Sequence, residues 1–164
     1  MTRRIFGVLC AAMTGVGAVA LAVMIAWTVA DVTLRAVFNR PIHGTVDLVE
    51  AALVLVVFLG LPESFLRREQ ITVDILDHAV PRGWLAGMRI AGALAALAFL
   101  VLMAIYVVQP MLDTWQFGDK KPDLAIPVFP LVLAIEISLI ASLAAMVFVT
   151  LGEVAAAASG QRNA

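Results

Sequence analysis

The sequence predicts an all-α integral membrane protein with four transmembrane helices and an amphipathic interfacial helix between the second and third. Hydrophobic residues make up 63% of the 164 residues and charged residues only 14%, whereas soluble domains are nearer half apolar and a quarter charged. The mean hydropathy is +1.02 and the net charge is −1. These values exclude a disordered chain, a nucleic-acid-binding protein and most soluble enzymes. They fit one membrane domain over residues 1–164.

Four stretches with few or no charges predict the transmembrane helices, since a crossing needs about 20 mostly apolar residues. Ile5–Ala30 and Ile90–Leu112 are uncharged and predict the first and third helices. The second has a short uncharged centre at 51–62 between carboxylates, and the fourth contains only Glu136 as a charge. The expected helices cover about residues 5–34, 46–66, 84–112 and 126–152.

The first predicted helix has some features of a cleaved signal peptide. An arginine pair precedes it, and Ala18-Val19-Ala20 resembles a cleavage site. Signal peptides have an apolar region of about 7–15 residues, whereas this apolar run continues to Ala30. We therefore expect a retained transmembrane helix.

The distribution of Lys and Arg predicts that both termini are cytoplasmic, because short cytoplasmic loops are enriched in these residues. Seven of the 11 Lys and Arg residues would then lie on the cytoplasmic side. These residues are Arg3, Arg4, Arg67, Arg68, Arg82, Arg89 and Arg162. The outer side would carry Arg35, Arg40, Lys120 and Lys121.

The segment between the second and third helices has the pattern of an amphipathic helix over about 68–80. Its apolar side chains share one helical face, and its polar side chains fall mostly elsewhere. The apolar face consists of Ile71, Ile75, Leu76, Ala79 and Val80. A helix of this kind lies in the plane of the membrane interface. Pro81 and Gly83 would end it.

Small residues recur at every fourth position on three of the expected helices, a spacing that lets helix backbones approach closely in lipid. The rows are Thr14, Ala18, Ala22, Ala26 and Ala30, with Ala11 and Gly15, in the first helix; Gly87, Ala91 and Ala95 in the third; and Ala134, Ser138 and Ser142 in the fourth. Two interpretations have equal weight. The rows either pack within the four-helix bundle or dock against a larger membrane partner.

Side chains that support catalysis or cofactor binding are sparse. Cys10 is the single cysteine, which excludes an intrachain disulfide and a cysteine-based metal cluster. His43 and His78 lie outside the apolar segments, whereas a membrane haem needs histidines at membrane depth. We therefore predict a protein that is not an enzyme and holds no cofactor or metal. Glu136 is the one ionisable residue deep within a span, and it is either a structural carboxyl or a functional one.

The densest polar pattern joins the first two helices. Asp31 and Arg35 are four residues apart and can pair on one helical face. Residues typical of a turn follow, namely Asn39, Pro41 and Gly44. Asp47 and Glu50 have the spacing of a helix N-cap and its N3 partner. These residues either only end one helix and begin the next, or also contact a partner, since Arg35 and Arg40 exceed what capping requires.

Several motifs stand in a characteristic order along the chain. They are Arg35-x-x-Phe38-Asn39-x-Pro41-Ile42-x-Gly44, Asp47-x-x-Glu50, Phe58-Leu59-Gly60-Leu61-Pro62, Arg67-Arg68-Glu69-Gln70-Ile71-x-Val73-Asp74-Ile75-Leu76 and Leu124-x-Ile126-Pro127. With these motifs, its length and its four expected helices, the chain resembles the DctQ-type small permease subunit of TRAP (tripartite ATP-independent periplasmic) transporters. It departs from the family at Gln70, where His is frequent, and at Asp47, where Glu is common.

The resemblance implies a small membrane subunit of a sodium-driven, binding-protein-dependent secondary transporter in the bacterial inner membrane. Its substrates would be organic acids of the C4-dicarboxylate or sugar-acid type. In such systems a large membrane subunit carries the substrate and sodium sites, and a periplasmic protein captures the substrate. The small subunit would be a non-catalytic scaffold for the large subunit and part of the docking surface for the binding protein.

Roles for particular residues follow from this resemblance and from their expected positions. Candidates for the helix corner or the subunit interface are Arg35, Asn39, Asp47, Glu50 and Glu136. Candidates for docking the binding protein are Arg40, Asp113, Asp119, Lys120, Lys121 and Asp123. Candidates for contact with inner-leaflet headgroups are Arg67, Arg68, Arg82 and Arg89.

Two alternatives belong to other functional classes. A membrane anchor of a respiratory oxidoreductase would need intramembrane histidines for haem, and a small homodimeric exporter would need a carboxylate in the first helix. The apolar segments contain no histidine, and the uncharged stretch of the first helix, Ile5–Ala30, contains no carboxylate.

Overall fold

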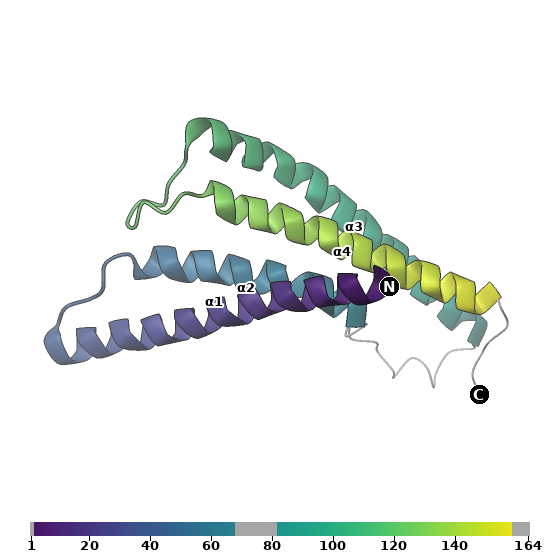
Figure 1. Ribbon diagram of the computed structural model, residues 1–164, viewed down its shortest axis with the longest axis horizontal. Coiled ribbons are helices and arrows are strands. Elements are labelled where there is room, and N and C mark those ends of the chain that lie inside the picture. Colours follow the sequence, from purple (N-terminus) through teal and green to yellow (C-terminus); the bar gives the residue numbers. More distant parts are fainter. Residues whose placement is uncertain (1, 68–81, 159–164) are drawn as a thin grey trace.

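The computed structural model describes residues 2–67 and 82–158, which form four helices (Figure 1). The helices are α1 (Thr2–Phe38), α2 (Thr45–Arg67), α3 (Arg82–Phe117) and α4 (Phe129–Ala158). Each contains a segment long and apolar enough to cross a membrane. The predicted all-helical fold, with four helices able to span a membrane, is thereby confirmed for the described residues. The predicted interfacial helix at 68–80 lies outside the described residues.

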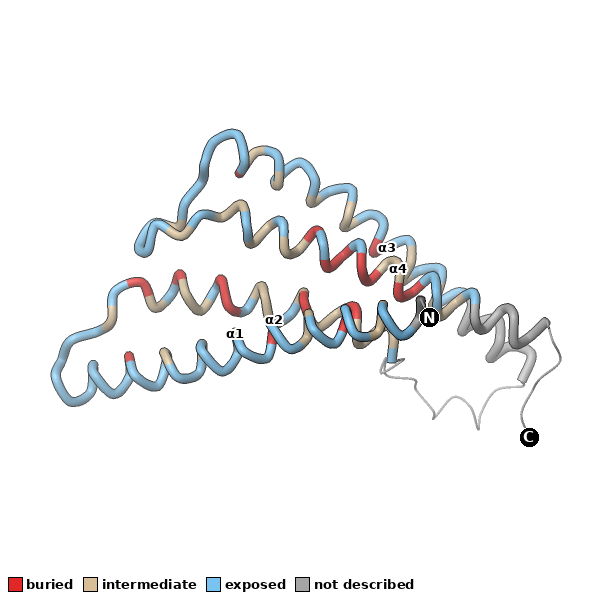
Figure 2. Tube along the Cα trace, in the orientation of Figure 1, coloured by how far each residue is buried: buried red, intermediate tan, exposed pale blue. Residues whose placement is uncertain are grey.

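The four helices form an open row in the order α1, α2, α4 and α3. Two antiparallel hairpins, α1–α2 and α3–α4, lie side by side, and α2 and α4 meet between them (Figure 1). Near the chain termini, Phe6 of α1 also meets Phe148 of α4, with ring centroids 5.5 Å apart. The inner helices α2 and α4 carry most of the buried positions, whereas α1 and α3 are exposed along much of their length (Figure 2).

A cluster of buried apolar residues lies between α3 and α4, next to α2. Leu100, Leu139 and Met146 are buried there, and Phe58 and Phe65 of α2 pack against them. Van der Waals contacts between closely fitting apolar side chains are one of the interactions that hold helices together in lipid. This cluster therefore joins the two hairpins along their apolar length.

The packing face of α1 follows a seven-residue repeat. Cys10, Gly17 and Asp31 are buried and Met24 is half-buried, as expected for a seam of coiled-coil type. A Cβ atom at Gly17 would lie 3.4 Å from the carbonyl oxygen of Leu55, so α1 and α2 approach closely at this position.

The predicted rows of small residues divide between interior and surface. In α4, Ser138 and Ser142 are fully buried, so this row packs inside the chain. In α1, the row of Ala18, Ala22, Ala26 and Ala30 is exposed. For these four alanines, packing within the bundle was the wrong interpretation. In α3, Ala91 and Ala95 are exposed as well.

A proline in α2 accounts for one contact between the hairpins. Pro62 lies inside α2 and is fully buried. Because proline has no N–H, it cannot bond to the carbonyl oxygen of Phe58 one turn earlier. The hydroxyl of Ser138 on α4 donates a hydrogen bond to that oxygen instead. A buried backbone acceptor is thus satisfied across the interface of α2 and α4.

We expect Ser138→Ala to lower the free energy of unfolding by about 1 kcal/mol, because it leaves the Phe58 carbonyl without a donor. The measurement is unfolding of the purified chain in detergent micelles. Ser142→Ala is the matched control, since Ser142 is equally buried but its hydroxyl has no partner among the described residues. Pro62→Ala restores the missing N–H, so Ser138→Ala should cost less in that background. An equal cost in both backgrounds would contradict the interpretation.

Candidate functional site

The corner between α1 and α2 is organised by a buried carboxylate. Asp31 is only 3% exposed. Its oxygens accept hydrogen bonds from the Arg35 guanidinium at 2.9 Å and from the backbone N–H of Ile42 at 2.6 Å. The predicted pairing of Asp31 with Arg35 is confirmed. Asp31 also fixes the chain after the end of α1, because Ile42 lies beyond the turn.

Asn39 ends α1 and reverses the chain direction. Its φ of 52° lies in the left-handed region, where asparagine is tolerated better than most residues. Its N–H donates to the carbonyl oxygen of Arg35 at 3.1 Å, which completes the last helical turn. The predicted turn between the first two helices is confirmed. The indole N–H of Trp27 on α1 donates a hydrogen bond of 3.4 Å to Thr45 Oγ1 on α2, which links the two helices across the corner.

The carboxylate of Asp47 joins the two hairpins. Asp47 is 4% exposed, and its Oδ2 atom accepts the backbone N–H groups of Asp123 and Leu124 at 2.8 and 2.9 Å. The prediction of Asp47 as the N-cap of α2 was wrong. The helix already begins at Thr45, and the carboxylate points to the α3–α4 loop rather than to its own first turn.

The α3–α4 loop is folded on itself as a short hairpin. Lys121 N–H donates to the carbonyl oxygen of Ile126, and Val128 N–H donates to that of Asp119, both at 2.9 Å. Ala125, with a φ of 52°, makes the tight reversal between them. The loop therefore presents a defined backbone to the start of α2.

Two further contacts hold this loop against α2. The Lys121 ammonium forms an ion pair with Glu50. Gly44, with a φ of 77°, lies against the Leu124 side chain so closely that a Cβ atom would be 2.2 Å from Leu124 Cγ. We call the set of Gly44, Asp47, Glu50, Lys121, Asp123 and Leu124 the hairpin clasp. It joins α1–α2 to α3–α4 at the end of the molecule away from the termini (Figure 1).

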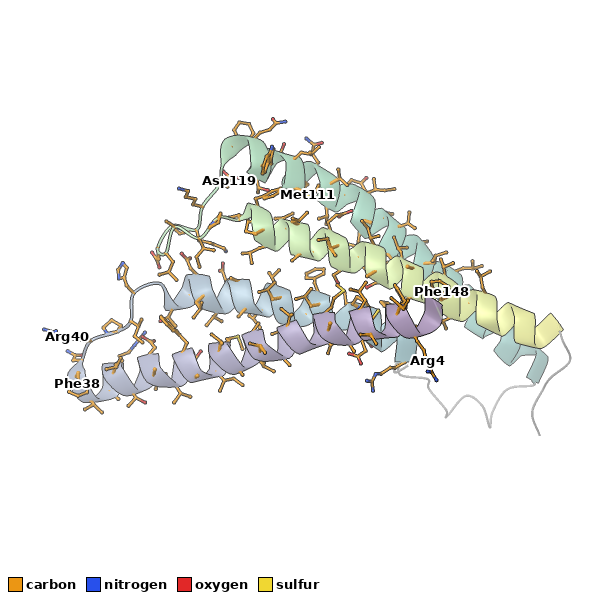
Figure 3. All side chains as sticks on the ribbon, viewed as in Figure 1. Arg4, Phe38, Arg40, Met111, Asp119 and Phe148 are labelled. Atoms are coloured by element: carbon orange, nitrogen blue, oxygen red, sulfur yellow. The ribbon has the colours of Figure 1, made fainter. Side chains whose placement is uncertain are left out.

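The residues predicted to dock a binding protein gather at the clasp end. Arg40 and Asp119 both lie there (Figure 3). Arg40, Asp119, Lys120 and Asp123 are exposed. The other two are engaged within the chain, Lys121 with Glu50 and Asp113 as acceptor of a 3.2 Å hydrogen bond from Gln109. The exposed members form a surface of mixed charge.

Three of the four residues predicted to contact inner-leaflet headgroups belong to the opposite end. Arg67 is exposed at the end of α2 and pairs with Glu63 at 2.5 Å. Arg82 and Arg89 lie in the first turns of α3, and Arg68 lies outside the described residues. The basic residues of α2 and α3 are thus separated from the clasp by the length of the helices.

Glu136 is buried in α4 and is 9% exposed. Its Oε2 atom has no hydrogen-bond partner among the described residues. It lies within an apolar span, where a carboxyl group without a partner is costly. Within residues 2–67 and 82–158, no group of three or more His, Cys, Asp and Glu side chains is placed to hold a metal ion.

We expect Glu136→Met to leave the stability unchanged or to raise it by about 1 kcal/mol. Methionine has a similar length and fills the same space without an unsatisfied oxygen. Thermal unfolding of the purified chain in detergent micelles measures the effect. A loss of stability above about 1 kcal/mol would mean that the carboxyl group makes a favourable interaction in the folded chain.

The comparisons with known proteins identify one family. The family described as tripartite ATP-independent periplasmic transporters, DctQ component, matches residues 24–160. The match therefore includes the α1–α2 corner, the clasp and α4. No curated protein matches the chain, and no solved structure matches it.

Proposed function

The chain belongs to the DctQ family of small permease subunits of TRAP transporters, and we propose that it is the non-catalytic scaffold of a sodium-driven transporter for organic acids. The substrates are of the C4-dicarboxylate or sugar-acid type. The family match over residues 24–160 carries this proposal. The geometry agrees with it, because the polar side chains at the clasp end bind one another and tie the two hairpins together.

We propose that the exposed row of alanines on α1 contacts the large membrane subunit. Ala18, Ala22, Ala26 and Ala30 leave a smooth strip on an edge helix. A strip of this kind lets a helix of another subunit approach closely. On α3 the exposed small residues Ala91 and Ala95 are followed one turn later by the bulky Phe99, so that row is shorter than the one on α1. A role for Glu136 at this interface stays a prediction.

We propose that the clasp end of the molecule contacts the periplasmic binding protein. Cytoplasmic termini would place the α1–α2 corner and the α3–α4 loop outside the inner membrane. Arg40, Asp119, Lys120 and Asp123 would then face the binding protein. Exposed charges at the edge of an interface change the association rate more than the affinity. Arg67, Arg68, Arg82 and Arg89 would lie among the headgroups of the cytoplasmic leaflet.

The test of this function is co-purification of the tagged chain with a large TRAP membrane subunit from the same organism. We expect one-to-one recovery after gentle solubilisation. We also expect sodium-driven uptake of a labelled C4-dicarboxylate or sugar acid in proteoliposomes that contain both subunits and the binding protein, but not when this chain is left out. Elution of the chain alone as a homo-oligomer, or together with a haem protein, would overturn the proposal.

A matched pair of variants tests the choice of interface. Ala26→Trp places a large ring on the exposed row of α1 and should abolish co-purification. Ala95→Trp places the same ring on the exposed face of α3 and should leave it intact. If both variants co-purify equally with the large subunit, the α1 row is not the interface, while the family function still stands.

A further inference from the structure

A cavity of about 330 Å³, open to the surface and lined by both polar and apolar atoms, lies between α1 and α2 in the half of the molecule away from the clasp. It is lined by Thr14, Gly60, Glu63, Ser64 and Arg67. Gly60 leaves space in the wall of the cavity, because it has no side chain. A Cβ atom at Gly60 would meet no atom within 4 Å. The transporter function proposed above makes no use of this cavity.

The cavity combines opposite charges with hydroxyl groups inside a membrane span. Glu63 and Arg67 are one helical turn apart, and their ion pair of 2.5 Å joins one nitrogen to one oxygen. The pair is not bidentate, so both groups have polar atoms beyond it. Thr14 and Ser64 add two hydroxyl groups to the lining. Such a site suits a ligand that carries both a phosphate and an ammonium group.

The surface beside the cavity is apolar on the side towards the clasp. Leu53 and Val57 are exposed on α2. With Gly60, Ser64 and Arg67 they share one helical face, because the spacing is i, i+4, i+7, i+11 and i+14. One strip of α2 thus changes from apolar in the middle of the span to polar at its end. A ligand matched to this strip has a polar head and an apolar tail.

We propose that this cavity binds the headgroup of phosphatidylethanolamine, with an acyl chain along Leu53 and Val57. The Arg67 guanidinium binds the phosphate, as its fork of N–H donors suits, and the Glu63 carboxylate binds the ammonium. The hydroxyl groups of Thr14 and Ser64 complete the polar lining. Glu63 and Arg67 have opposite charges, and Glu63 repels a headgroup with net negative charge. The site therefore prefers phosphatidylethanolamine to phosphatidylglycerol.

The test is lipid binding to the purified full chain by native mass spectrometry, with phosphatidylethanolamine and phosphatidylglycerol as probes. We expect phosphatidylethanolamine to bind about tenfold more tightly, a difference of about 1.4 kcal/mol. Glu63→Gln should remove this preference, whereas Arg67→Gln should weaken the binding of both lipids and leave the preference in place. Equal binding of the two lipids by the unchanged chain would overturn the proposal, as would displacement by millimolar inorganic phosphate, which would indicate a simple anion site.

A steric variant tests the cavity without changing its charges. Gly60→Leu fills the space and should reduce phosphatidylethanolamine binding by about tenfold, corresponding to about 1.4 kcal/mol. Gly92→Leu on α3 is the matched control, since Gly92 is exposed and a Cβ atom there also meets nothing within 4 Å. Circular dichroism reports whether each variant is folded. Unchanged lipid binding in folded Gly60→Leu protein would show that the lipid binds elsewhere.

Discussion

Replacing Gly44 by alanine is expected to lower the free energy of unfolding by about 2–3 kcal/mol. Two effects add at this position. The φ of 77° is a left-handed conformation that costs a residue with a Cβ atom about 1–2 kcal/mol. The new Cβ atom would also lie between 2.2 and 2.9 Å from three carbon atoms of the Leu124 side chain, which must move. Denaturant unfolding of the purified chain in micelles measures the loss.

Gly118→Ala separates the two effects. Gly118 has a similar φ of 66°, but a Cβ atom there meets nothing within 4 Å. Gly118→Ala should therefore lower the free energy of unfolding only by the conformational part, about 1–2 kcal/mol. Adding Leu124→Ala to Gly44→Ala should remove the steric part of the cost. If the two glycine variants lose the same stability, the close approach of Gly44 to the Leu124 side chain adds no steric cost, contrary to this prediction.

Local patterns in the sequence were sufficient to predict the four helices and the corner between the first two. Charge-free stretches marked the spans, and the spacing of Asp31 and Arg35 predicted their ion pair, which forms within a single helix. The ends of the helices were predicted less well. α3 continues beyond 112 to Phe117, and there Asp113 accepts a hydrogen bond from Gln109 one turn earlier. An apolar pattern indicates which residues lie within the membrane, but a helix can continue beyond those residues.

Contacts between distant segments could not be predicted in this way. The partners of Asp47 are backbone N–H groups at 123 and 124, which any residue except proline can supply. The side-chain types in the sequence therefore carry no signal for the contact that Asp47 makes with the loop. The alanine row of α1 illustrates the same limit. Its spacing indicates a face that can pack closely, but only the structure shows that α2 packs on the neighbouring face with Cys10 and Gly17.

Replacing Asp47 by alanine is expected to release the α3–α4 loop from α2 and to lower the free energy of unfolding by about 3 kcal/mol. The carboxylate accepts two N–H groups, and hydrogen bonds to a charged group contribute about 1.5–3 kcal/mol each. The lower part of that range applies, because Asp123 and Leu124 are exposed. In the variant, water can accept hydrogen bonds from their backbone N–H groups. Asp47→Asn keeps an acceptor oxygen without the charge, so its cost should be intermediate.

Hydrogen exchange distinguishes loss of this contact from a general loss of stability. Asp47→Ala should speed exchange at the amides of Asp123 and Leu124 well before those of α4. Glu50→Gln is the control, because it removes the neighbouring ion pair with Lys121, and exposed pairs contribute at most about 1 kcal/mol. It should leave these two amides protected. If Glu50→Gln exposes them as much as Asp47→Ala does, the ion pair rather than the buried carboxylate holds the loop, and the order of importance within the clasp is reversed.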